Sequence, residues 1–216
     1  MSLKAQIDAY NVQKDAKLPA DVLALMNTTN EELIAQHIKD NALQIGQKVE
    51  NFSLANHNGE NIELADLLKK GPVIISFYRG GWCPYCNLEL KALNDYLPQF
   101  KTQSAQLVAI SPQLPDETLS TAQKNDLEFD VLSDLSNKVA EQFGLLFTLD
   151  ERIQALYTQF GIDFEHYYGD KSFKLPLPAT YVINQKGVIT YAFLSEDYTL
   201  RAEPIDVMTA LESENN

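Results

Sequence analysis

The most informative stretch of the sequence is Pro72-Val-Ile-Ile-Ser-Phe-Tyr-Arg-Gly-Gly-Trp-Cys-Pro-Tyr-Cys86. Its first half, residues 72–78, is almost continuously apolar, which is typical of a central strand covered on both faces. Gly80 and Gly81 then provide a flexible turn, and Pro84 fits the first position of a helix, where no backbone N–H is needed. The stretch therefore predicts a buried strand, a turn and a helix, with the motif Cys83-Pro84-Tyr85-Cys86 at the start of the helix.

The position of the two cysteines favours redox chemistry. Cys83 is expected at the N-cap and Cys86 in the first turn, where unpaired backbone N–H groups and the helix dipole stabilise a negative charge. Such a place lowers the pKa of a thiol below its usual ~8.5. Side chains three positions apart on a helix lie on one face, so the pair can close a short disulfide. Trp82 is expected beside the pair, either as a wall of the site or as an ordinary packing aromatic.

Two other interpretations of the motif are weaker. A closed zinc site needs four ligands, and His37, His57 and His166 are the only histidines and have no paired spacing. We therefore expect no metal and no cofactor, and we interpret the histidines as surface or packing residues. Inert core cysteines are disfavoured by the strand–turn–helix context. Two neighbouring cysteines also cross-link too short a loop to stabilise a fold.

The composition limits the class of protein and its partners. The chain has 216 residues, 45% of them hydrophobic, and a formal net charge of −13. It can bury a real core, and its acidic surface disfavours nucleic acid and membranes as partners. No apolar stretch reaches the ~20 residues that a membrane span needs, and residues 1–10 lack the apolar core of a secretory signal. We therefore expect a cytoplasmic location.

The pattern along the chain divides it into two parts. Residues 1–45 are expected to form a helical N-terminal extension, with Thr29 as an N-cap and Glu32 completing a capping box; this part would pack on the main domain or on a second copy in a homodimer. Residues 46–216 are expected to form one α/β domain of three layers, whereas 145–178 has no clear pattern. In this domain a hairpin is expected at Asn58-Gly59, and the helix after the motif is expected to weaken at Pro98. Strands are predicted at 49–54, 61–64, 72–78, 106–110, 129–132, 180–183 and 188–193, and helices at 65–70, 118–125, 137–143 and 204–211.

Several segments carry a family resemblance. Phe77 to Cys86 resembles the active-site segment of the thioredoxin superfamily. The flanking sequence resembles peroxiredoxins of the alkyl hydroperoxide reductase/thiol-specific antioxidant family, over about residues 46–212. This resemblance implies a thioredoxin fold with a mixed central sheet and a peroxiredoxin-type N-terminal hairpin. The segments that carry it are 49–54, 58–59, 62–64, 107–112, 129–134 and 178–183, followed by Gly187.

The catalytic pattern of that family is only partly present. Peroxiredoxins carry Pro-x-x-x-Thr-x-x-Cys, and anchoring this pattern on Cys86 puts Arg79 at the proline and Cys83 at the threonine. Pro178 stands where the family has an arginine, and it resembles the proline that faces the dithiol of thioredoxins, where it is cis. The chain thus looks like a hybrid subgroup with a thioredoxin-type dithiol. Arg79 and Arg201 are the candidates to replace the missing arginine, and Arg79, Trp82 and Pro178 are the expected wall of the active site.

The resemblance implies an oxidoreductase and leaves three hypotheses open. In the first, the chain is a thiol-dependent peroxidase: Cys86 attacks hydrogen peroxide or an organic hydroperoxide, Cys83 forms the disulfide, and thioredoxin or a small thiol reduces it. In the second, it is a protein-disulfide oxidoreductase in which Cys83 attacks first. In the third, the dithiol is a redox switch that controls binding of a partner through the N-terminal helices.

Overall fold

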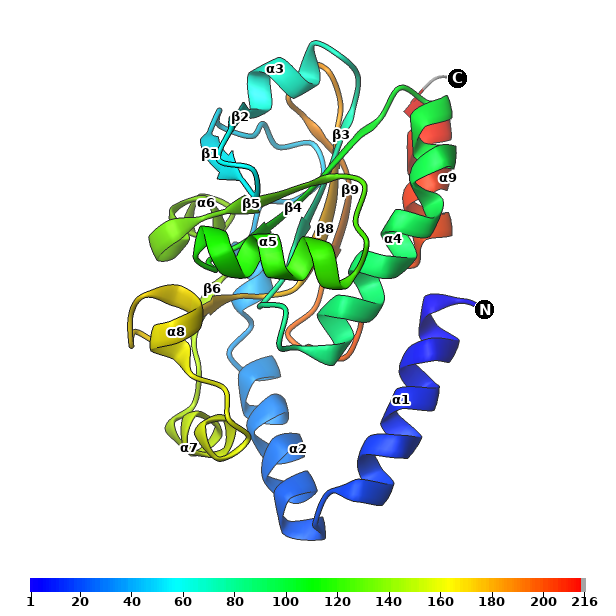
Figure 1. The fold of residues 1–216 in the computed structure, drawn as a ribbon. Helices are drawn as coiled ribbons and strands as arrows, with labels where there is room; N and C mark the ends of the chain where they lie inside the picture. Colours follow the sequence, from blue (N-terminus) through cyan, green and yellow to red (C-terminus); the bar gives the residue numbers. More distant parts are fainter. Residues whose placement is uncertain (215–216) are drawn as a thin grey trace.

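The computed structural model describes residues 1–214 and has a seven-stranded mixed sheet with helices on both faces (Figure 1). The order of the strands is β2-β1-β5-β4-β3-β8-β9. This architecture confirms the predicted three-layer α/β class. The strands of the sheet are β1 (Ser53–Asn56), β2 (Asn61–Glu63), β3 (Val73–Phe77), β4 (Gln106–Ser111), β5 (Asp130–Ser133), β8 (Ala179–Ile183) and β9 (Ile189–Leu194).

Strand β3 lies inside the sheet, between β4, to which it is parallel, and β8, to which it is antiparallel. All five of its residues are buried. Because side chains alternate along a strand, Val73, Ile75 and Phe77 point into one hydrophobic cluster, and Ile74 points into the other. The prediction of a strand covered on both faces is therefore confirmed.

The helices divide between the two faces of the sheet. One cluster is built from α1 (Leu3–Lys17), α4 (Pro84–Thr102), α5 (Pro115–Lys124) and α9 (Pro204–Glu214). The other is built from α3 (Leu64–Leu68), α6 (Lys138–Gln142), α7 (Glu151–Gln159) and α8 (Phe164–Tyr168), with α2 (Ala20–Ile34) packed against it. A small sheet of β6 (Leu146–Thr148) and β7 (Lys174–Pro176) and two 3₁₀ turns, Ile38–Asn41 and Leu135–Asn137, complete the described elements.

The two N-terminal helices straddle the start of α4. In Figure 1 they diverge from a tight connection like the arms of a V, with α1 beside α4 and α2 beside α7. The predicted helical extension is present, but the capping box is wrong. Thr29 lies inside α2, where its hydroxyl donates to the carbonyls of Leu25 and Met26. The helix already begins at Ala20, because Leu25 and Met26 continue the same apolar face as Leu33. The domain boundary near residue 45 stays a prediction.

Two further expectations need correction. The hairpin at Asn58-Gly59 is confirmed, with Gly59 at φ +83°, but its first strand begins at Ser53 rather than Val49. Val49 is instead held by the hydrogen bond from its N–H to the carbonyl of Gly187. Helix α4, which was expected to weaken at Pro98, continues through it to Thr102, because the burial of Phe100 outweighs the hydrogen bond that a proline removes. Among the described helices, none is long and apolar enough to cross a membrane.

Candidate active site

The dithiol lies at the start of α4, as predicted. Cys83 is the N-cap, with φ −84° and ψ 116°, and Pro84 opens the helix. The turn before it needs both glycines, since a Cβ on Gly80 would lie 2.5 Å from the Trp82 ring nitrogen and one on Gly81 2.3 Å from the Thr121 hydroxyl. Both cysteines are free thiols and both are buried, with Cys83 2% exposed and Cys86 fully buried.

Cys83 faces a cavity of about 500 Å³. The α1 and α2 helices close one side of this cavity, and α7 and the following loop form another. Cys86 is not among the lining residues, so only Cys83 meets a molecule bound there. Seven of the lining residues are aromatic: Tyr10, Trp82, Tyr85, Tyr157, Phe160, Tyr167 and Tyr198.

Arg79 is the charged group beside Cys83. It is 2% exposed, and its Nη2 donates to the hydroxyl of Tyr157 at 2.8 Å. Its guanidinium lies 4.9 Å from the ring centres of Trp82 and Tyr198, a cation–π distance. No Asp or Glu among residues 1–214 forms an ion pair with Arg79, in contrast to the other buried arginine, Arg201. Its charge is therefore free to act on the thiol.

Trp82 and Tyr168 hold the turn that carries Arg79. The ring nitrogen of Trp82 donates to the Tyr168 hydroxyl at 2.6 Å, and that hydroxyl donates to the Arg79 carbonyl at 2.8 Å. These two bonds tie residues 79–82 to helix α8 and fix where the guanidinium and the indole stand.

Cys86 has a different environment. Nη2 of Arg201 donates to the Cys86 sulfur at 3.5 Å, and Nε of Arg201 forms an ion pair with Glu89 at 2.8 Å. The other carboxyl oxygen of Glu89 accepts from the Thr180 hydroxyl at 3.0 Å. Burial raises the pKa of Glu89 to about 7, although the charge of Arg201 opposes this. Cys86 thus lies beside a buried ion pair, in which the charges of Arg201 and Glu89 offset each other.

The two thiols consequently differ in pKa. Burial opposes ionisation of Cys83, but the hydrogen bond from Cys86 and the charges of Arg79 and Arg201 outweigh it and lower the pKa of Cys83. Burial, together with the neighbouring Cys83, raises the pKa of Cys86, and the arginines do not compensate. Of the two thiols, Cys83 is therefore the one that ionises more readily.

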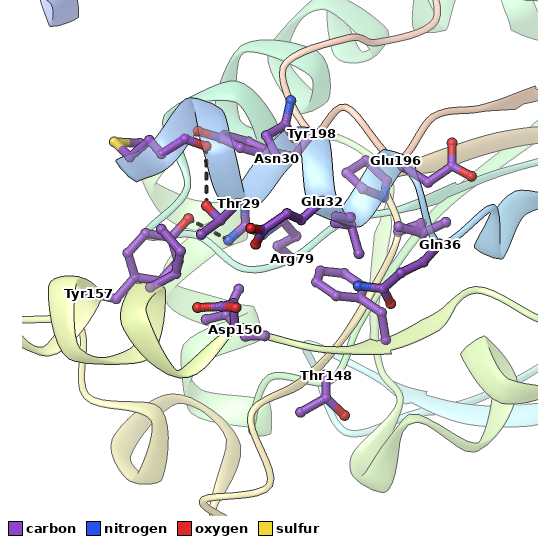
Figure 2. Close-up of a pocket in the computed structure, with 17 residues that line it drawn as sticks. Thr29, Asn30, Glu32, Gln36, Arg79, Thr148, Asp150, Tyr157, Glu196 and Tyr198 are labelled. Atoms are coloured by element: carbon purple, nitrogen blue, oxygen red, sulfur yellow. Dashed lines mark hydrogen bonds between the residues drawn. The ribbon is translucent and has the colours of Figure 1, made fainter. Parts of the chain in front are cut away.

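Arg79 also lines a second cavity, of about 160 Å³ (Figure 2). It shares Arg79, Tyr157 and Tyr198 with the Cys83 cavity, and α2 covers it. Pro178 lines this second cavity and not the first. No peptide bond among the described residues is cis, so the expected likeness to the thioredoxin proline does not extend to its geometry. The chain runs extended from β7 into β8 here, with the Leu177 N–H bonded to the carbonyl of Leu145.

The structure brings together Cys83, Cys86, Trp82 and Arg79, and it adds groups that the sequence analysis did not name. Glu89 follows Cys86 by three positions on one helix, and this spacing was a usable signal. Tyr157 comes from the segment without a readable pattern, and nothing in the sequence marked it. The histidines stand apart from the site, and residues 1–214 contain no cluster of three metal-ligating side chains.

Comparison with known proteins gives the family. The family model described as "AhpC/TSA family" matches residues 45–192, and this chain belongs to that family. It is 31% identical over 105 residues to peroxiredoxin Bcp of Escherichia coli, covering 49% of this chain and 67% of Bcp. It is 27% identical over 177 residues to chloroplastic peroxiredoxin Q of Triticum aestivum, covering 82% of this chain and 71% of that protein.

A further relative is named as a thiol-disulfide oxidoreductase and not as a peroxiredoxin. The thiol-disulfide oxidoreductase ResA of Bacillus thuringiensis is 28% identical over 109 residues, which are 50% of this chain and 62% of ResA. This chain thus matches less than two thirds of the length of that relative.

The solved structures confirm the thioredoxin-like peroxiredoxin fold. The peroxidoxin BcpB of Mycobacterium tuberculosis matches with a TM-score of 0.62 and 22% identity, over 79% of this chain and 97% of that one. Peroxiredoxin Q of Xanthomonas campestris matches with a TM-score of 0.61 and 17% identity, over 82% and 99%.

Proposed function

We propose that this chain is a thiol-dependent peroxidase in which Cys83 attacks the peroxide and Cys86 forms the disulfide. The observation that carries the proposal is the contrast between the two thiols. Cys83 lines a cavity beside an arginine that has no carboxylate partner and has a lowered pKa, whereas Cys86 is fully buried, does not line that cavity and has a raised pKa. Membership of the AhpC/TSA family and the peroxiredoxin relatives support the same class of reaction.

The first step oxidises Cys83. Its thiolate attacks the terminal oxygen of the hydroperoxide ROOH, an S–O bond forms and the O–O bond breaks. The leaving RO⁻ takes up a proton and departs as ROH, and Cys83 becomes a sulfenic acid. The charge that develops on the leaving oxygen needs donors already in place. Arg79 supplies them, since it stands beside Cys83 and has no carboxylate of its own.

The second step closes the disulfide. The sulfur of Cys86 attacks the sulfenic sulfur of Cys83, and water leaves. Cys86 must lose its proton for this, and Glu89, three positions on in the same helix and with a pKa of about 7, is suited to receive it. An external thiol donor then takes the pair back to two thiols and is itself oxidised to a disulfide. A reducing compartment such as the cytoplasm supplies such donors.

This order reverses the one expected from the family pattern. Anchoring that pattern on the sequence put the attack on Cys86, whereas burial and charge favour Cys83. A protein-disulfide oxidoreductase is the second candidate, and the similarity to ResA favours it. The exposed fraction of 2% at Cys83 argues against it, because a protein disulfide has to approach the attacking sulfur in line. The same burial favours a small thiol over thioredoxin as the reductant.

The experiment is a competition between two oxidants. Reduced protein is mixed with hydrogen peroxide or with a model protein disulfide, and the loss of two thiols is followed by mass spectrometry and Trp82 fluorescence. The proposal expects oxidation by peroxide far faster than that of a free thiolate, with one intrachain disulfide formed. Peroxide oxidation no faster than that of a free thiol, with rapid exchange with the protein disulfide, would establish the oxidoreductase instead.

A further inference from the structure

The charges around the Cys83 cavity are opposite in sign to those of the whole chain. The chain has 30 acidic and 17 basic residues. Yet the described residues that line the cavity include Lys14, Lys17 and Arg79 and no Asp or Glu. From this we infer that the cavity binds an organic hydroperoxide that carries a carboxylate, and that Lys14 and Lys17 recognise that carboxylate. The inference deepens the proposed function and rests on it for the reactive end of the ligand.

The two lysines come from a different element than the reacting sulfur. Both lie on the last two turns of α1, whereas Arg79 is buried beside Cys83. Lys17 is exposed and forms no ion pair within the described chain. Lys14 is 14% exposed and is held only loosely, with its Nζ 3.4 Å from both an Asp15 oxygen and the Tyr85 hydroxyl. Both ammonium groups can therefore reorient toward a bound anion at little cost in free energy.

The helix dipole alone does not explain this arrangement. Lysines in the last turn of a helix are stabilised by its negative end, so their presence on α1 needs no ligand. The absence of carboxylates from the cavity lining does point to a ligand. The chain is acidic and has few cationic residues, yet three of them line this one cavity. Electrostatic complementarity of this kind selects the sign of the ligand charge.

The wall between the two cationic ends is apolar. Tyr10 and Tyr85 pack edge to face at 5.1 Å, and Tyr85 and Tyr198 do so at 5.5 Å, which forms a continuous aromatic surface. A volume of about 500 Å³ is that of an ordinary small-molecule site. The ligand that fits both features has a hydroperoxide directed to Cys83, an apolar body on the tyrosines and a carboxylate at the lysines.

The lysines belong to the part of the chain that precedes the family match. That match begins at residue 45, after both α1 and α2. The carboxylate selectivity is thus assigned to the N-terminal helices of this chain, and it gives the predicted helical extension a role in substrate choice.

Two measurements test the inference. The first is the rate of oxidation of reduced protein by a fatty-acid hydroperoxide and by its methyl ester, in wild type and in Lys14→Gln/Lys17→Gln. The second is binding of decanoate and of decanol, followed by the fluorescence of Trp82, the only tryptophan and a wall of the cavity. Lys4→Gln is the matched control, since Lys4 lies on the same helix, pairs with Asp8 and does not line the cavity.

The inference expects the wild type and Lys4→Gln to favour the acid over the ester. In the double variant the acid-to-ester rate ratio and the decanoate-to-decanol affinity ratio both fall, roughly three- to tenfold, as two partly exposed ion pairs allow. Unchanged ratios in the double variant overturn the inference, whatever the rate with peroxide. Slow oxidation by every hydroperoxide, with lysine-dependent decanoate binding, would instead overturn the proposed function and leave the carboxylate site standing.

Discussion

Cys83 and Cys86 are three residues apart on one helix and are both buried, yet the groups around the two sulfurs differ. On the Cys83 side a cavity reaches the sulfur, and Arg79 has no carboxylate partner. On the Cys86 side the sulfur belongs to a fully buried residue that lines neither of the two cavities described above, and Arg201 is paired with Glu89. Both arginines act on both thiols, but only Cys83 also accepts a hydrogen bond from its partner, and there the bond and the two charges together outweigh burial. The difference in pKa therefore depends on the pairing of the two thiols as well as on the arginines.

Removal of the uncompensated charge is expected to have the largest effect. In Arg79→Gln the pKa of Cys83 rises, because burial then acts with less opposition. The rate of oxidation by hydrogen peroxide falls about a hundredfold, the usual loss when one donor to the leaving oxygen is removed. The thiolate absorbance during a pH titration and stopped-flow rates measure the two effects. Arg152→Gln, at an exposed arginine that is paired with Glu32 and Asp150, is the control and keeps both values. Equal losses in the two variants would contradict this role of Arg79.

The Arg201–Glu89 pair is expected to make the free energy of unfolding depend on pH. The pKa of Glu89 is about 7 in the folded chain against an ordinary value of 4.5, so the folded state binds the proton more tightly than the unfolded state. This contribution is complete below pH 4.5 and is lost as the pH rises to 7. The loss amounts to about 3 kcal/mol at 1.36 kcal/mol per unit. Denaturant unfolding at several pH values measures it as the difference between wild type and Glu89→Gln, and a difference that does not change with pH would argue against a buried titrating Glu89.

The same residue is expected to affect the second chemical step and not the first. In Glu89→Gln, oxidation of Cys83 keeps its rate, whereas closure of the disulfide slows on the order of tenfold, because Cys86 loses a proton acceptor. In the wild type the closure rate rises with pH through about 7, where the Glu89 carboxylate forms, and this inflection is absent from the variant. The two phases of Trp82 fluorescence separate the steps. Slowing of the first phase alone would mean that Glu89 acts on Cys83.

The smallest effect is expected from the groups that only position Arg79. Tyr168→Phe removes one acceptor from the Trp82 N–H and one donor from the Arg79 carbonyl. Buried groups left without partners cost about 1–3 kcal/mol of stability, and the peroxide rate is expected to fall only about two- to threefold. Tyr96→Phe is the control, since the Tyr96 hydroxyl has no hydrogen bond within the described part of the chain and Tyr96 does not line the cavity. Thermal unfolding and stopped-flow rates measure both variants, and identical behaviour would remove the positioning role.

The placement of the two cysteines could be predicted from the sequence. The apolar run before Gly80 and the proline at 84 fixed a strand, a turn and a helix start, because each residue type has a strong local preference. The order of attack was not readable, since it depends on Arg201, Tyr157 and Tyr198, which come from segments 70 to 115 residues away along the chain. Thr29 shows a local pattern overruled by packing: a good capping sequence was absorbed into a longer helix once its apolar neighbours packed against α7.

The cationic lining of the Cys83 cavity could not be predicted from the sequence either. Lys14 and Lys17 look like ordinary surface lysines of an amphipathic helix, and only the packing of α1 beside α4 brings them to the mouth of the cavity that contains Cys83. The homodimer and the cytoplasmic location stay predictions.

The most direct test of the account is stopped-flow mixing of reduced Cys83→Ser and Cys86→Ser with hydrogen peroxide, followed by the fluorescence of Trp82. The account predicts that Cys86→Ser is oxidised as fast as the wild type and stops at a sulfenic acid on Cys83, which a dimedone adduct identifies by mass. It also predicts that Cys83→Ser reacts no faster than a free thiol. Rapid oxidation that persists in Cys83→Ser and is lost in Cys86→Ser would contradict the account and return the attack to Cys86.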